Sequence, residues 1–526
     1  MLSITLTENN GFMNKIFKTV SGMFVIMMLA KLLGQVREIM LAGFYGTSSE
    51  ASAFLAASQI PLNFFDMILG LAIVSAFVPV FNEYYQKYGK KEANEFANNF
   101  VGILLVVSFA MTLLGTFFSS NLVNILANGF NDEVSRLTSN LLKIMFPSLI
   151  FTAVAYSYAG VLQSFGEFKI PAAMSIASNL AAILYFLLFN KNAGIYGLSV
   201  AMLIGWGLQL LILIPALIRL DYKFGVSFNF MHAGMKKVYK LALPILLSSW
   251  VQPLNVMINT YIASFIDNGN AVSYINYANK LYVIIVGVFT MSVTNLILPE
   301  LSRLFSSNNH KESANVITSS IKAVIIFILP IMLLFLTYSY QIVEIVYMRG
   351  AFDKTSAYMT SVALFFYSFG MLGFGLQEIL NKSFYSMQNS IIPMKNAFFT
   401  IAINIIFSFL LYKKMGVGGL ALASAIAATC SAANLTIQLK KRLLNIDLRS
   451  SFVVMVKSTL AAIISCAVSR IIYIYLAEFA NGFISKLSIL GLCALIAFVV
   501  YLISLIIFKV EEIKNIIIKK GVADVD

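Results

Sequence analysis

A chain of 526 residues that is 59% hydrophobic and only 11% charged is not an ordinary soluble protein, in which about a quarter of the residues carry a charge. Its apolar runs are about twenty residues long and are separated by short polar links, which predicts membrane-spanning helices and excludes a β-barrel. The net charge of +14 does not indicate a nucleic-acid partner, because the basic residues gather in alternate links, as the positive-inside rule requires.

The apolar runs predict an all-α polytopic membrane protein with fourteen transmembrane helices. We expect these helices near residues 17–42, 51–82, 96–117, 137–163, 170–189, 194–218, 239–266, 271–298, 316–337, 357–386, 392–412, 416–437, 453–475 and 485–508. With the N-terminus inside, about 25 basic residues fall on the cytoplasmic side and about 8 on the other, so both termini are expected to be cytoplasmic.

The first twelve predicted helices contain an internal repeat. Pro171 is followed 23 residues later by the run that begins at Gly194, and Pro393 is followed at the same spacing by the run that begins at Gly416. Six helices per half is an even number, so the two lobes should be related by a pseudo-two-fold axis along the membrane normal, with a substrate cavity between them. We therefore expect a lobe at 1–218, a lobe at 219–437, and two additional helices with an amphipathic cytoplasmic tail at 438–526.

Three charged residues, Lys31, Arg37 and Glu38, interrupt the first apolar run. Charges within a membrane span are costly and usually face a bundle interior or a wet cavity, so they are candidates for function. Earlier in each half, S-A-F-V-P ending at Pro79 aligns with N-L-I-L-P ending at Pro299, and at that same offset Arg37 and Glu38 correspond to Met257 and Ile258. The charge pair is thus not duplicated with the scaffold, which favours substrate binding over an internal ion pair that locks the helix to a neighbour. Lys31 either lines the cavity or extends to the membrane surface.

Six short motifs, in order along the chain, resemble the MurJ/MviN-type lipid II flippases, which belong to the multidrug/oligosaccharidyl-lipid/polysaccharide exporter superfamily. The similarity covers essentially the whole chain, and it rests on the order of the motifs because no single one is decisive. The motifs are L-L-G-Q-V-R-E (Leu32 to Glu38), A-F-V-P (Ala76 to Pro79), Y-A-N-K-L (Tyr277 to Leu281), N-L-I-L-P (Asn295 to Pro299), R-G-A-F (Arg349 to Phe352) and F-Y-S-M-Q-N-S-I-I-P (Phe384 to Pro393).

The resemblance implies transport of undecaprenyl-pyrophosphate-linked peptidoglycan precursor, lipid II, from the inner to the outer leaflet of the bacterial cytoplasmic membrane. It also implies that Arg37 is a cavity base for the pyrophosphate and that Glu38 holds the acidic position beside it. Lys31 and Lys280 stand where the family usually has arginine, and Asn279 stands where it has aspartate. Arginine grips a phosphate bidentately whereas lysine is a flexible point charge, so these replacements change the chemistry of the cavity.

The second predicted helix departs further from the family pattern. Ser52 occupies the family's acidic position at the start of this helix, and Phe65 and Asp66 replace its basic pair. Asp66 remains a candidate cavity carboxylate for gating or ion coupling. The missing basic pair favours, as an alternative, a flippase for another polyprenyl-linked glycan.

An antiporter and a membrane transferase are the alternative classes of function for this chain. A drug or cation antiporter of the same superfamily has twelve spans and cavity carboxylates, whereas this chain has two further helices and a basic cavity. A membrane glycosyl or acyl transferase would carry clustered carboxylates or a loop histidine. We expect a transporter and not an enzyme, without a cofactor or metal, driven by the membrane potential or a cation. The expected partners are the lipid-linked substrate and membrane lipid, and the protein is expected to be a monomer.

Overall fold

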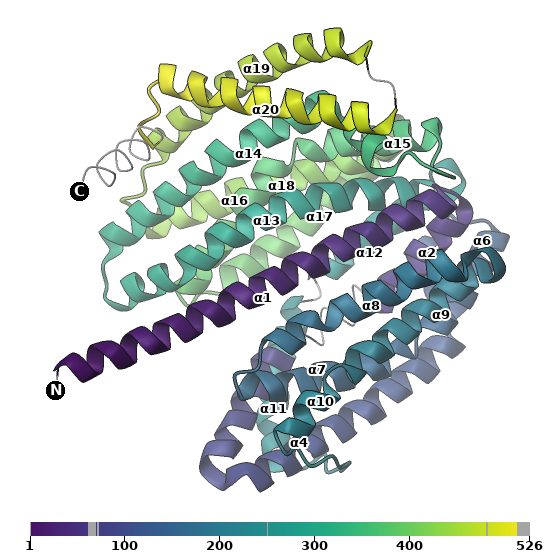
Figure 1. Ribbon diagram of the computed structural model, residues 1–526, viewed down its shortest axis with the longest axis vertical. Coiled ribbons are helices and arrows are strands. Elements are labelled where there is room, and N and C mark those ends of the chain that lie inside the picture. Colours follow the sequence, from purple (N-terminus) through teal and green to yellow (C-terminus); the bar gives the residue numbers. More distant parts are fainter. Residues whose placement is uncertain (1, 62–69, 71–72, 250, 480–481, 513–526) are drawn as a thin grey trace. The chain divides into compact units, whose positions relative to one another are not determined.

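The computed structural model describes residues 2–61, 70, 73–249, 251–479 and 482–512, and every regular element among these residues is a helix (Figure 1). The all-α membrane class predicted from the sequence is thus confirmed. The chain divides into two compact units, Met1–Val272 and Ser273–Asp526.

The first unit contains long helices and several short ones. Its elements are α1 (Leu2–Tyr45), α2 (Ser49–Gln59), the π-helix η2 (Ile73–Phe77), α4 (Val78–Phe117), α5 (Ser119–Ala127), α6 (Asp132–Met145), α7 (Ser148–Ser164), α8 (Lys169–Leu188), α9 (Asn190–Leu211), α10 (Ile214–Arg219), α11 (Ala233–Ser249), α12 (Val251–Ala263) and the 3-10 helix η3 (Asp267–Gly269). The predicted spans near 51–82 and 96–117 are not separated by a coil, because α4 continues between them and changes direction at Gly89.

The second unit consists of eight helices in the described residues, the first of which begins just before the boundary. They are α13 (Ala271–Ser306), α14 (His310–Tyr347), α15 (Lys354–Ser368), α16 (Met371–Ser386), α17 (Ile391–Met415), α18 (Val417–Arg442), α19 (Leu448–Ala477) and α20 (Phe483–Ile507). The two last helices, α19 and α20, run side by side (Figure 1).

Within the described residues, nine helical segments are long and apolar enough to cross a membrane. They are Ser75–Phe117, Asp132–Ser164, Lys169–Leu188, Asn190–Arg219, His310–Tyr347, Ile391–Met415, Val417–Arg442, Leu448–Ala477 and Phe483–Ile507. The pair α15 and α16, bent by 49°, makes a tenth if it counts as one span. The described parts of the predicted spans near 17–42, 51–82, 239–266 and 271–298 coincide with helices. Their membrane crossing stays a prediction, as do the count of fourteen and the lobe arrangement.

The two halves of the repeat share a turn conformation. Gly194 and Gly416 have φ of 54° and 55° and ψ of −151° and −130°, a region of backbone space that is essentially confined to glycine. Pro171 and Pro393 both lie in the third position of their helices, where a missing N–H costs nothing. The same proline-to-glycine spacing in the sequence therefore builds the same helix and turn in both units.

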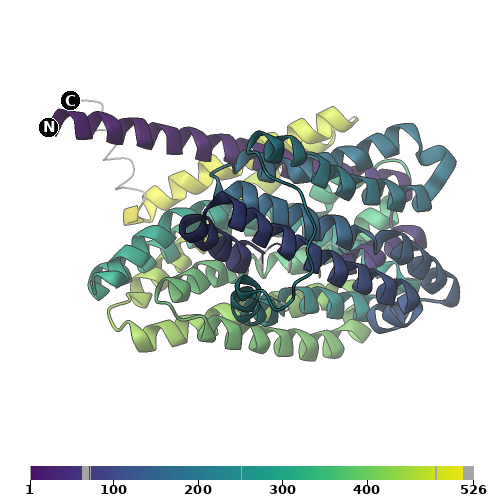
Figure 2. The ribbon, with the colours of Figure 1, turned by 90° about the horizontal axis from the view of Figure 1, so that it is seen from below.

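The segment that follows α10 is an extended stretch of chain (Figure 2), and two adjacent asparagines of α4 hold it. The Asn99 side chain donates to the carbonyl oxygen of Asn229 at 2.9 Å and accepts from the Asn229 N–H at 2.6 Å. The Asn98 amide donates to the carbonyl oxygen of Lys223, and the hydroxyl of Tyr222 donates to Asn98 Oδ1. These bonds give this extended segment, which contains no regular element before α11, a defined path.

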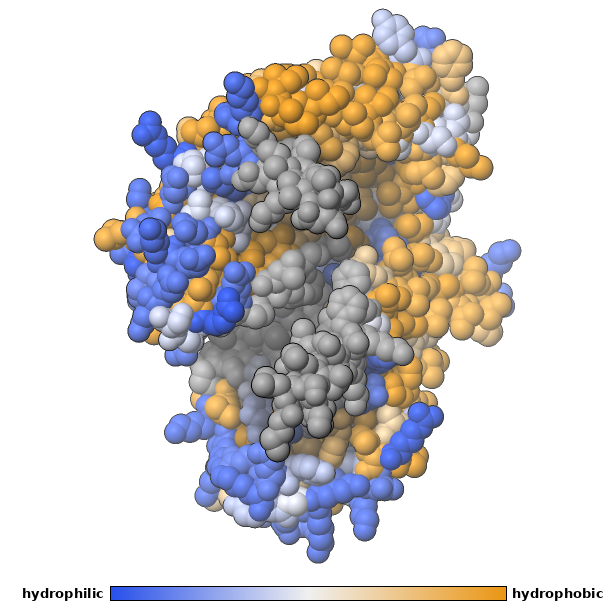
Figure 3. All heavy atoms as spheres, turned by 60° about the vertical axis from the view of Figure 1, so that its left-hand side comes forward, coloured by the Kyte–Doolittle hydropathy of each residue, from blue (hydrophilic) through white to orange (hydrophobic). Residues whose placement is uncertain are grey.

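The surface carries the apolar character that a bilayer requires. On the face drawn in Figure 3, broad areas of apolar side chains lie beside separate patches of hydrophilic ones. In α19 and α20 only 28% of the spanning window is buried, and large side chains such as Phe452, Leu460, Leu495 and Phe498 are exposed. Such a surface would be unstable in water and is stable against lipid chains.

Candidate functional site

Arg37 and Glu38 form an ion pair within helix α1. The Arg37 Nη2 atom lies 2.7 Å from Glu38 Oε1, and the two side chains are 21% and 5% exposed. Adjacent helical residues point about 100° apart, so the long arginine side chain turns back toward its neighbour to make this contact. The pair brings a nearly buried carboxylate and a more accessible guanidinium together, and the Arg37 donors that do not face Glu38 are available to an anion.

Lys31 lines a cavity of about 460 Å³ between α1, the end of α7 and the beginning of α8. Its neighbours in the lining include Met27, Gln163, Phe168 and Ser175, and Lys31 is the charged residue among the described lining side chains. The side chain is exposed to this cavity rather than packed in the core. The structure thus places Lys31 beside a cavity within the first unit, and its part in substrate binding stays a prediction.

Contacts with α8 and with the start of α9 hold helix α1 beside this cavity. The Asn179 amide donates to the carbonyl oxygen of Ala30 at 3.3 Å, and a Cβ atom at Gly34 would lie 3.5 Å from the same amide nitrogen. The Tyr45 hydroxyl donates to Asn190 Oδ1 at 2.6 Å near the end of α1. Small and polar residues at these contacts let two membrane helices approach closely, as expected where apolar burial alone gives no driving force.

The other candidates in the first unit are differently placed. Ser52 lies in the first turns of α2, is fully buried, and donates its N–H to the carbonyl oxygen of Ser48. It is therefore in the packed interior of the unit. Phe65 and Asp66 lie outside the described residues.

Asn279 and Lys280 lie in α13 of the second unit and are half-buried. The neighbouring Tyr277 is buried and stacks near Tyr347 of α14, with ring centroids 5.1 Å apart. Aromatic contacts of Tyr277 thus anchor this part of α13 to α14. The structure places Lys31, Arg37, Glu38 and Ser52 in one unit and Asn279 and Lys280 in the other.

Two arrangements of buried polar groups were missed by the sequence analysis. The first joins α2 and α12, where the Gln59 amide nitrogen lies 2.6 Å from the Thr260 hydroxyl and both residues are buried. No charge or motif marks these two residues, which are 201 positions apart. A polar pair of this kind is found only once the helices are placed.

The second arrangement joins α14, α19 and α20. The Arg470 guanidinium lies over the rings of Tyr338 and Tyr473, 5.8 and 5.3 Å from their centroids, and Glu344 pairs with Lys486 at 2.6 Å. A charge inside an apolar run is the signal that singled out Arg37, and the same signal is present for Arg470 in the predicted span 453–475.

The same three helices enclose an apolar cavity of about 420 Å³. It is lined by side chains of α14, α19 and α20, among them Pro330, Ile331, Phe498 and Leu502, with Ser465 as a small polar member. Its lining suits a hydrocarbon chain and offers little to a charged ligand.

Comparison with known proteins identifies the family of this chain. The family model described as "Lipid II flippase MurJ" matches residues 41–505. The chain is 28% identical over 417 residues to "Probable lipid II flippase MurJ" of Buchnera aphidicola subsp. Baizongia pistaciae, covering 78% of this chain and 81% of the relative. To the protein of the same name from Rhizobium tropici it is 28% identical over 489 residues, covering 90% and 91%. To "Lipid II flippase MurJ" of Burkholderia cenocepacia it is 26% identical over 432 residues, covering 81% and 83%.

Solved structures agree with these relatives. A structure described as "Lipid II flippase MurJ, inward closed conformation" matches with a TM-score of 0.80 and 25% identity, covering 93% of this chain and 98% of that one. An inward-facing multidrug resistance MATE family transporter of the MOP superfamily matches with a TM-score of 0.69 at 12% identity, over 81% and 99%, which shows a shared fold. The named members are flippases, that is, transporters and not enzymes. Because the family model spans residues 41–505 of the 526, this chain belongs to the lipid II flippase MurJ family.

Proposed function

We propose that this protein is a lipid II flippase, which moves the undecaprenyl-diphosphate-linked peptidoglycan precursor from the inner to the outer leaflet of the bacterial cytoplasmic membrane. The observation that carries the proposal is the match of 93% of the chain to a lipid II flippase structure at a TM-score of 0.80. Relatives named for the same activity support it over most of their length.

The diphosphate is bound by basic side chains of a central cavity. Arg37 is the principal contact, because a guanidinium donates two parallel hydrogen bonds to a phosphate, and Glu38 at 2.7 Å orients it. Lys31 and Lys280 add positive charge as flexible ammonium groups, with Asn279 as a neutral donor. Ser52, which is fully buried, supports the cavity from the packed interior without contacting the diphosphate, and Asp66 has a gating or ion-coupling role.

The polyprenyl tail stays in the hydrocarbon of the membrane while the headgroup crosses. Part of this tail binds against the two additional helices. The apolar cavity between α14, α19 and α20 supports this assignment. Transferring a chain of isoprene units out of lipid would cost about 0.8 kcal/mol per methylene, so a continuous apolar path is required for the tail.

Transport follows an alternating-access cycle between two lobes, residues 1–218 and 219–437, with 438–526 as an addition. The shared turn geometry of Gly194 and Gly416 supports the duplication on which this division rests. Both termini are cytoplasmic, and the protein acts as a monomer without a nucleic-acid partner. The membrane potential or a cation drives the cycle, since moving one charge through 100 mV yields about 2.3 kcal/mol.

The test is complementation of a bacterium depleted of its own lipid II flippase, combined with an assay for lipid II exposed on the outer leaflet. We expect growth and outward lipid II with the wild-type chain. Well-expressed protein that restores neither would overturn the proposal and favour the second candidate, a flippase for another polyprenyl-linked glycan. The replacement of a basic pair by Phe65 and Asp66 is the observation that keeps this candidate.

A further inference from the structure

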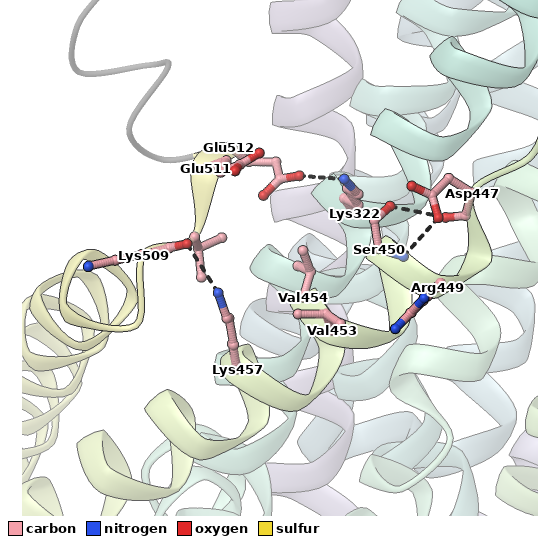
Figure 4. A pocket seen from close by; sticks show the side chains of 11 residues that line it. Lys322, Asp447, Arg449, Ser450, Val453, Val454, Lys457, Lys509, Glu511 and Glu512 are labelled. Carbon is pink, nitrogen blue, oxygen red and sulfur yellow. Dashed lines mark hydrogen bonds and ion pairs between the residues drawn. The ribbon is translucent and has the colours of Figure 1, made fainter.

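A cavity of about 330 Å³ lies where α19 begins and α20 has just ended, beside Lys322 of α14 (Figure 4). Both α19 and α20 are long and apolar enough to span a membrane. A cavity at the beginning of one span and the end of the next lies at the level of lipid headgroups. We refer to it below as the α19–α20 basic cavity.

The lining contains four basic side chains and three acidic ones, together with Ser450 and three valines. Three of the charged groups are already engaged with the protein. Lys322 pairs with Glu512 at 2.7 Å, and Asp447 caps α19 by accepting from the Ser450 N–H at 2.9 Å. Hydrogen bonds from the Ser450 backbone and hydroxyl lower the pKa of Asp447, which keeps this carboxylate charged in its capping role.

The other three cations, Arg449, Lys457 and Lys509, have no carboxylate within ion-pair distance among the residues that the structure describes. Arg449 and Lys509 are exposed. Lys457 is half-buried, and its ammonium donates to the carbonyl oxygen of Lys509 at 3.2 Å (Figure 4). An ammonium has three donors, so two of those of Lys457 remain for a ligand in the cavity.

Lys457 lies deeper in an apolar helix than its single hydrogen bond to the Lys509 carbonyl explains. It lies nine residues after the start of α19, about 14 Å along the axis of an apolar span. Phe452, Val456 and Leu460, at helical spacing beside it, are 60%, 42% and 50% exposed and form a lipid-facing stripe. A cation at this depth reaches back toward the headgroup level, with hydrocarbon along its stem.

We infer that the α19–α20 basic cavity binds the phosphodiester headgroup of an anionic phospholipid through Arg449 and Lys457, with an acyl chain along the exposed stripe of α19. The Lys509 side chain points away from these two residues in Figure 4 and adds positive charge at the edge of the cavity. Basic pockets between membrane helices are suited to such headgroups. The lining has one positive charge in excess, which matches a singly charged phosphodiester better than the more highly charged diphosphate of the transported lipid. The inference concerns a second lipid site and does not depend on which glycan is transported.

The test measures binding of phosphatidylglycerol to the purified full-length protein by native mass spectrometry, with phosphatidylcholine as the uncharged comparison. The Lys457→Gln and Arg449→Gln double variant removes two positive charges, while glutamine at 457 keeps a donor for the Lys509 carbonyl. We expect phosphatidylglycerol affinity to fall about tenfold, with phosphatidylcholine unaffected.

The matched control is the Lys440→Gln and Lys441→Gln double variant, which removes the same charge from the exposed last turn of α18. It should keep wild-type affinity. The single Lys457→Arg variant, which keeps the charge, should also bind phosphatidylglycerol like the wild type. Arg449→Gln alone, at an exposed position, provides a second measurement if the double variant does not fold.

Three results would overturn the inference. The first is unchanged phosphatidylglycerol binding in the cavity variants. The second is an equal loss in the α18 control, which would show non-local attraction. The third is a selective loss of undecaprenyl diphosphate binding with phosphatidylglycerol retained, which would assign the cavity to the transported lipid.

Discussion

Arg37 and Glu38 are neighbours in one helix, and their charged groups nevertheless meet at 2.7 Å. The pair places a guanidinium with 21% exposure against a carboxylate with 5% exposure. Glu38 thus holds one nitrogen of the guanidinium, and in the proposed function the remaining donors bind the phosphate. This relationship defines what substitutions at the two positions should do.

Replacing Arg37 by Ala should abolish transport while the protein remains folded in the membrane. The expected fall in outward lipid II is at least about tenfold, since two charge-assisted hydrogen bonds to the diphosphate are lost. Outer-leaflet lipid II and membrane protein level are measured in the same cells. The control is Met257→Ala, at the corresponding position of the second half, which should retain transport. Loss of the protein itself in the Arg37 variant would instead assign Arg37 a structural role.

Lys31 should tolerate arginine and not a neutral residue. Because it is the charged group in the described lining of its cavity, Lys31→Met removes that cavity's charge and should lower transport several-fold, whereas Lys31→Arg keeps it. Transport rates in reconstituted vesicles separate the two variants. Equal activity of both would exclude a role for the charge at this position.

Lys280 offers the same comparison in α13. Lys280→Arg should be active if the residue contacts a phosphate, because the family position ordinarily carries a guanidinium and the charge is conserved. Complementation growth together with expression level is the measurement. A folded but inactive Lys280→Arg protein would contradict a phosphate contact.

The two turn glycines should be sensitive to a side chain. Gly194→Ala and Gly416→Ala each force an alanine into a backbone region that only glycine adopts easily, and each should destabilise its unit by about 1 to 3 kcal/mol. Gly207→Ala is the control, because a Cβ atom there meets open space within α9, and it should be neutral or slightly stabilising. Thermal unfolding in detergent compares the three. If the control is destabilised as much as the turn variants, the turn conformation is not the cause.

The asparagine pair on α4 should control the path of the segment after α10. Asn99→Ala removes two hydrogen bonds to Asn229 and should cost about 2 kcal/mol locally. Limited proteolysis of residues 221–232 should then be faster. Lys91→Ala, an exposed change on the same helix, should leave the cleavage rate unchanged. An unchanged rate in the Asn99 variant would show that other contacts hold the segment.

Much of this protein could be predicted from local sequence, since its signals are properties of single helices. Run length and composition predicted an all-helical membrane protein, and ten of the predicted spans match described helices or a bent pair that can cross a membrane. The proline-to-glycine spacing predicted two equivalent helix–turn units, which share a backbone conformation. The order of six motifs predicted the family, which the comparisons confirm.

The tertiary structure decided which groups meet. Lys31 faces residues 163–175, Gln59 meets Thr260, and Arg470 lies over the ring of Tyr338, each through helices distant in the sequence. In a membrane the lipid-facing and protein-facing sides of a helix are equally apolar, so hydrophobic periodicity does not indicate which side packs against which neighbour. The sequence by itself therefore determined the class, the helices, the family and the charged candidates. Their cavities and partners followed only from close packing between helices.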